Sequence, residues 1–131
     1  MNPLIQIKKA VLVALACFGL SPMVQALLPP PPPDGGYPNN NTAEGDFALF
    51  NLTAGDDNTA IGFSALFTNT TGGFNTATGQ AALFTNTTGS FNTATGAIAL
   101  AGNTTGSFNT ATGDSALANN TTGSNNTANG V

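Results

Sequence analysis

Residues 75–91 read NTATGQAALFTNTTGSF, and this 17-residue pattern recurs along most of the 131-residue chain. Fixed self-similarity of this kind is the signature of a repeat architecture, in which each copy packs only against its neighbours. We therefore expect one stacked array over residues 41–131, with five copies and a partial sixth. The copies begin at Asn41, Asn58, Asn75, Asn92, Asn109 and Asn126.

Certain positions of the repeat keep an alanine, a leucine or one of two glycines. Two fixed glycines per copy oppose a helix, where each costs ~1 kcal/mol relative to alanine. They fit turns that need a positive φ angle or a close approach of two backbones. We expect these columns to shape the fold. They contain Ala60, Gly62, Leu66, Gly72, Ala77, Gly79, Leu83, Gly89, Ala94, Gly96, Leu100, Gly106, Ala111, Gly113, Leu117 and Gly123.

Two short stretches in each copy have strand-like composition, namely Thr-Ala-Thr and Ala-Leu-Phe-Thr. We expect each copy to form a coil of two short strands and two turns. Coils stacked at the ~4.8 Å strand spacing place identical residues above one another, which favours ladders of asparagine and threonine. Ala77 should point inward, with Thr76 and Thr78 outward. The predicted fold class is all-β, a parallel β-solenoid or β-roll.

The predicted core of each coil is thin, with two alanines, one leucine and at best two phenylalanines. A chain of about 90 repeat residues with so little apolar volume is marginal on its own. Several chains that share a core would supply the missing burial. Composition therefore favours a homo-oligomer.

The N-terminal segment has the features of an export signal. Lys8 and Lys9 precede an apolar run. Val24-Gln25-Ala26 then offers small residues at the usual positions for cleavage after Ala26. This predicts a signal peptide over 1–26, although an uncleaved anchor helix or a lipid anchor on Cys17 is an alternative. The prolines 29–33 favour an extended spacer over 27–40, with docking to an aromatic groove as the other interpretation. We expect a secreted or outer-surface protein with no membrane span in its mature chain.

Loss of the leader removes every basic residue and the only cysteine, and the sequence has no histidine. The formal side-chain charge falls from -4 to -6 because both lysines are lost. Nucleic acids require cations, and zinc or copper requires His or Cys, so neither partner is expected. We expect no enzyme activity and no cofactor.

Three local patterns have both a chemical and a structural interpretation. Asp114-Ser115 is an acid–hydroxyl pair, but it lacks a base partner, so we expect a solvated loop. Asp56-Asp57-Asn58 gathers oxygen atoms that suit calcium, and we expect an acidic turn instead. Asn-x-Thr triplets are glycan acceptors in some secretory pathways, and we attribute them to repeat geometry. These triplets begin at Asn51, Asn69, Asn86, Asn103 and Asn120.

The segment N-T-A-x-G-x-x-A-L resembles the head repeats of trimeric autotransporter adhesins. The resemblance covers residues 41–131 and implies a left-handed parallel β-roll, with three chains around one axis. No anchoring segment of the kind such adhesins carry follows the repeats, so we expect a truncated gene or a piece of a longer adhesin. The matching residues of one copy are Asn75, Thr76, Ala77, Gly79, Ala82 and Leu83.

The predicted function is structural and adhesive. The chain would present asparagine and threonine ladders and aromatic side chains to a host, matrix or carbohydrate surface. One alternative is a subunit of curli-like amyloid fibres, although Gln80 is the only glutamine in the repeats. A second alternative is ice binding, because the paired threonines of three copies resemble those of insect antifreeze coils.

Overall fold

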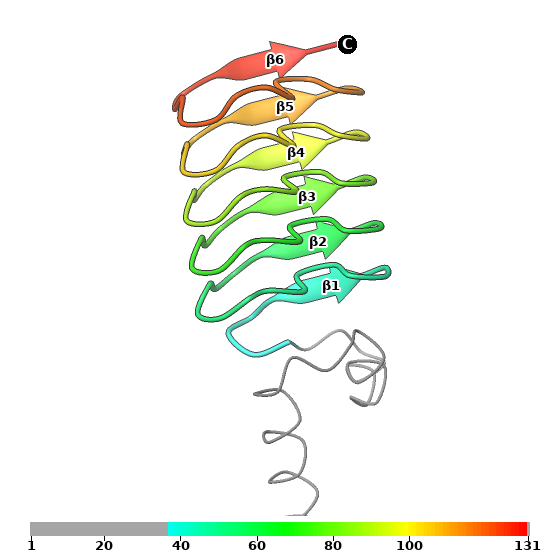
Figure 1. Ribbon diagram of the computed structural model, residues 1–131, viewed down its shortest axis with the longest axis vertical. Coiled ribbons are helices and arrows are strands. Elements are labelled where there is room, and N and C mark those ends of the chain that lie inside the picture. The colour runs from blue at the N-terminus through cyan, green and yellow to red at the C-terminus, as the bar shows by residue number, and fades with distance from the viewer. Residues whose placement is uncertain (1–36, 131) are drawn as a thin grey trace, which may run out of the picture. The chain divides into compact units, whose positions relative to one another are not determined.

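The computed structural model describes residues 37–130, which contain all the repeats. The predicted signal peptide and most of the predicted spacer lie outside the described residues. Within 37–130 the protein is all-β, with six parallel strands in a single sheet whose order follows the sequence (Figure 1). The strands are β1 (Thr42–Glu44), β2 (Thr59–Ile61), β3 (Thr76–Thr78), β4 (Thr93–Thr95), β5 (Thr110–Thr112) and β6 (Thr127–Asn129).

Each strand pairs with the equivalent residues of the next coil, without any shift in register. Thr76 faces Thr93, and Ala77 faces Ala94. The same match holds at the other four strand pairs. The predicted parallel β-solenoid with a 17-residue coil is therefore confirmed.

The prediction of two strands per coil was wrong. The Ala-Leu-Phe-Thr segment forms turns, because Leu83 within it and Ala81 just before it adopt positive φ angles of 52° and 53°. A strand requires negative φ angles, so neither residue can continue one. The segment still pairs coil to coil, since the Leu66 amide donates to the Ala82 carbonyl at 3.0 Å and the Thr68 amide to the Phe84 carbonyl at 3.1 Å.

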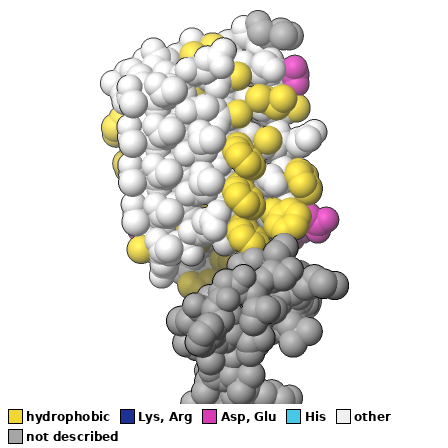
Figure 2. Space-filling model, viewed as in Figure 1, with side chains coloured by type: hydrophobic (Ala, Val, Ile, Leu, Met, Phe, Trp, Pro, Cys, Tyr) yellow, Lys and Arg dark blue, Asp and Glu magenta, His cyan; other side chains and the backbone are white. Residues whose placement is uncertain are grey.

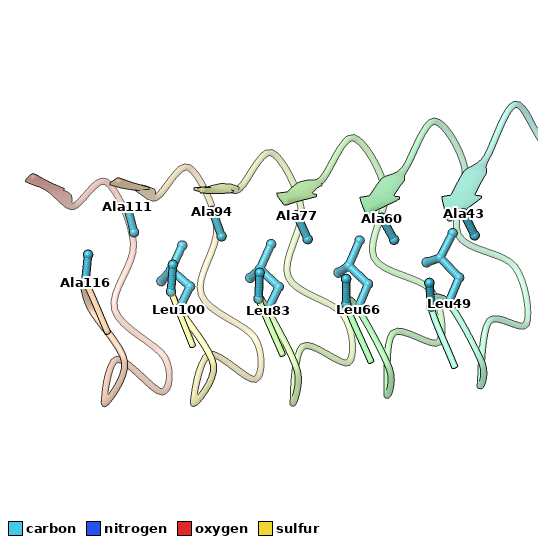
Figure 3. Packing of buried hydrophobic residues seen from close by; sticks show 14 residues of the cluster. Ala43, Leu49, Ala60, Leu66, Ala77, Leu83, Ala94, Leu100, Ala111 and Ala116 are labelled. Atoms are coloured by element: carbon cyan, nitrogen blue, oxygen red, sulfur yellow. The ribbon is translucent and has the colours of Figure 1, made fainter. Parts of the chain in front are cut away.

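The core lies between the strand and the returning turn segment of each coil. Figure 3 shows the strand alanines, such as Ala77 and Ala94, pointing toward leucines such as Leu83 and Leu100. These alanines and leucines are completely buried in the middle coils, and Leu117 packs against the same cluster. The predicted inward alanines and outward threonines are confirmed.

The core contains asparagines, and not the phenylalanines that the sequence suggested. Asn75, at the start of a copy, and Asn86, in its second half, are both completely buried. The phenylalanines lie outside the core, half-buried or exposed. An interior with so little apolar volume is stabilised by hydrogen bonds along the axis as well as by hydrophobic contact.

The two glycine columns have different roles. Gly79 has a φ of 133°, which glycine adopts without steric cost. Gly89 has no such φ angle, but a β-carbon there would overlap the Gly106 carbonyl of the next coil and the Asn86 side chain. A β-carbon on Gly79 would also overlap the Gly96 carbonyl, so close approach applies to both columns, and backbone conformation applies to the Gly79 column alone.

Candidate functional surfaces

Two asparagine ladders run through the interior of the solenoid. In the first, the Asn75 side-chain amide donates to Asn58 Oδ1 at 3.1 Å, and Asn75 Oδ1 accepts from the Asn92 amide group at 3.1 Å. In the second, Asn86 Nδ2 donates to Asn69 Oδ1 at 2.8 Å. Carboxamides can form such chains because each one carries both a donor and an acceptor. Among residues 37–130, no buried side-chain nitrogen or oxygen atom lacks a partner.

The interior position of these asparagines corrects the predicted adhesive surface. A buried ladder cannot be presented to a partner, so the exposed groups are threonines and aromatic rings. The burial also bears on the Asn-x-Thr triplets, since Asn69, Asn86 and Asn103 are completely buried while Asn51 is exposed. Sequence alternation contained the signal: Asn75 and Ala77 are two residues apart, so an inward alanine implies an inward asparagine.

A first candidate surface is formed by threonines of the strand face. One column is threonine in every copy and is exposed or half-buried. It consists of Thr42, Thr59, Thr76, Thr93, Thr110 and Thr127. A second column on the same face holds threonine only in β3, β4 and β5. Its other members are Glu44, Ile61 and Asn129.

A second candidate surface consists of two stacks of phenylalanine rings. Phe74, Phe91 and Phe108 stack with ring centroids 4.9 and 5.0 Å apart and planes within 1°. The exposed fractions of these three side chains are 49%, 48% and 57%. We call this column the exposed ring stack. Large apolar groups that remain in water indicate a contact surface.

The other stack belongs to the first three coils. Phe50, Phe67 and Phe84 stack at 5.3 and 5.2 Å, and Phe47 packs edge-on against Phe50 and Phe67. Later copies have Ala101 and Ala118 in this column. Figure 2 shows hydrophobic side chains gathered in columns on one face, with acidic side chains at its edge.

The acidic patterns from the sequence form no compact cluster. Asn58 belongs to the inner ladder, because its amide donates to Asn41 Oδ1 at 3.0 Å, so it does not complete an oxygen site with Asp56 and Asp57. Ser115 Oγ donates to Asp114 Oδ2 at 3.3 Å in an exposed position. Among residues 37–130 no group of three acidic, histidine or cysteine side chains is placed to hold a metal ion.

Within the described part of the chain, no helix has both the length and the hydrophobicity needed to cross a bilayer. No family model, no curated protein and no solved structure matches this chain. The resemblance to adhesin heads therefore stays a prediction from the repeat sequence. The function has to be argued from the surfaces.

Proposed function

We propose that this protein is a secreted or cell-surface structural and adhesive module that binds a surface partner. The exposed ring stack supports this most directly, since three coils in succession present a phenylalanine to solvent. Residues 37–130 contain acidic groups but no lysine, arginine or histidine, so contact through this surface would depend on apolar and hydrogen-bonding groups. The function is non-catalytic, and the predicted leader supports an extracellular location.

The adhesive function is tested by retention on coated surfaces. Beads carrying the purified chain should be retained on a neutral polysaccharide or on a matrix protein, with little dependence on salt, because apolar contacts are not screened. Phe91→Ser removes the middle ring and should lower retention, whereas Thr88→Ser on another exposed segment should not. Retention no greater than that of uncoated beads on every surface would exclude the proposal.

We also propose that the chain assembles as a trimer. The thin apolar core and the exposed Phe47 and Phe63, which lie outside the exposed ring stack, support association, because rings covered by a second chain would be removed from water. Light scattering should give three chain masses, independent of concentration above the dissociation range. A monomer at all concentrations, or mass that grows without limit, would contradict the trimer.

The fibre alternative requires coils of different chains to stack end to end. The Tyr37 amide donates to the Asn41 carbonyl at 3.1 Å. In the repeats the carbonyl at the equivalent position accepts a hydrogen bond from the threonine amide of the preceding coil. For example, the Thr42 amide donates to the Asn58 carbonyl at 2.8 Å. Tyr37 thus occupies the site where another coil would pair, which favours a discrete assembly. Dye-binding filaments that form with increasing concentration would support the fibre instead.

A further inference from the structure

The first threonine column of the strand face is more constant than the fold requires. Every copy has threonine there, whereas the second column, which lies on the same strands and face, varies among Glu, Ile, Thr and Asn. Both columns are in strands, so the β-propensity of threonine applies equally to both. Strand propensity alone therefore does not explain the constancy of the first column.

Some threonine hydroxyl groups of the turn segments join one coil to the next. Thr70 Oγ1 donates to the Thr87 carbonyl at 3.0 Å, and Thr87 Oγ1 donates to the Thr104 carbonyl at 2.9 Å, so these hydroxyls support stacking. Within residues 37–130, the strand threonines Thr76, Thr93 and Thr110 make no such bond, and neither do the exposed turn threonines Thr71, Thr88 and Thr105, so what sets the strand hydroxyls apart is their arrangement in rows on one sheet. Their hydroxyls are free to bond to something external.

The spacing of these groups is regular in two directions. Neighbouring strands lie ~4.8 Å apart, and alternate residues of one strand ~6.6 Å apart. In β3, β4 and β5 both columns are threonine, which gives three matched rows of hydroxyl and methyl groups. The only charged residue in either column is Glu44, at one end. A partner that uses all the rows has to repeat with the same spacing.

The dimensions of the face decide between possible occupants. Three residues by six strands cover ~10 by ~24 Å, or ~240 Å², whereas a stable protein interface needs ~800 Å² per partner. A folded protein or a second copy would therefore be held too weakly through this face alone.

We propose that the strand threonines form a binding surface for ordered water, namely the surface of ice. A hydroxyl both donates and accepts hydrogen bonds, as a lattice water does, and the adjacent methyl presents apolar area without charge. The threonines of β1, β2 and β6 extend the first column beyond the three matched rows. This activity goes beyond the adhesive function and uses different side chains from the exposed ring stack.

The test compares Thr93→Lys with Thr88→Lys in the purified chain. Thr93 lies in the middle of the face, and Thr88 is an exposed threonine in a turn segment. Unmodified protein should hold ice crystals from growing in a small interval below the melting point. Thr93→Lys should reduce that interval about tenfold, because a lysine must be desolvated against the lattice. Thr88→Lys should leave it unchanged.

Circular dichroism of both variants should match that of the unmodified chain, since both positions are exposed. Thr93→Val keeps the methyl group and replaces the hydroxyl by a second methyl, so it should give an intermediate interval. Absence of any effect of the unmodified protein on ice growth would overturn the proposal, as would equal losses in the two lysine variants. Binding to crystalline cellulose or chitin that Thr93→Lys abolishes, without an effect on ice, would assign the face to a polysaccharide instead.

Discussion

The side chain of Asn75 makes four hydrogen bonds inside the solenoid. Its Nδ2 donates to Asn58 Oδ1 and the Gly89 carbonyl, and its Oδ1 accepts from the backbone and side-chain amides of Asn92. Each carboxamide therefore joins three successive coils. Such a chain of bonds is stabilising only when every member is satisfied, because an unpaired buried polar group costs about 1–3 kcal/mol.

Asn75→Ala should lower the free energy of unfolding by about 3 kcal/mol, since it leaves the buried Asn92 backbone amide without an acceptor and opens a small cavity. Asn51→Ala is the matched control, because Asn51 is exposed and makes one bond, at 3.0 Å to the Phe67 carbonyl. That variant should change stability by no more than about 0.5 kcal/mol. Urea denaturation monitored by circular dichroism gives both values, and similar losses in both variants would contradict an internal ladder.

At some turn positions of each coil, the close approach of the neighbouring coil determines which residue fits. Gly89 lies where the backbone of one coil approaches that of the next, and a β-carbon there would overlap backbone atoms that cannot move without opening the stack. Gly73 precedes Phe74 in a neighbouring turn, where a β-carbon would first meet the side-chain end of Asp56. Later copies have Ser90, Ser107 and Ser124 in the position of Gly73.

Gly89→Ala should therefore destabilise the protein by more than about 2 kcal/mol, in the range that steric overlap in a packed interior produces. Gly73→Ala should stay within about 0.5 kcal/mol of the unmodified chain, because a side chain is already accommodated at that position of the coil. Thermal unfolding of the two variants makes the comparison. If Gly73→Ala were the more harmful, close approach would not be the reason for the constant glycine.

The repeat itself predicts part of the fold. Its period gives the coil length, and the alternation within Thr-Ala-Thr gives the strand and the inward direction of the alanine. The turn segment could not be predicted, because Leu83 adopts a left-handed φ angle that leucine disfavours by about 1–2 kcal/mol. Local preference favours a strand there, and burial of the leucine between coils overrides it. The interior asparagines were missed because a polar residue is expected outside unless its partners are known, and here the partner is the same residue of the next coil.

At the scale of the whole molecule, the solenoid behaves as a row of equivalent units. Equivalent residues of adjacent coils are separated by 17 positions, as in the bonds from Asn75 to Asn58 and from Asn92 to Asn75. Among residues 37–130, each strand of the sheet pairs only with its immediate neighbours. Stability in such an array is the sum of contributions from single coils and from the contacts between adjacent coils.

Deletion of residues 75–91 removes one complete coil and joins Phe74 to Asn92 in the same register. We expect this variant to keep its β-sheet circular dichroism and to lose only the contribution of one coil and one contact, with a lower unfolding midpoint. Deletion of residues 75–92 removes one residue more, which places Thr93 where the inward asparagine belongs and shifts that coil's residues by one position. That variant should lose cooperative unfolding and become sensitive to proteases. Equal behaviour of the two deletions would mean that coil register does not hold the molecule together.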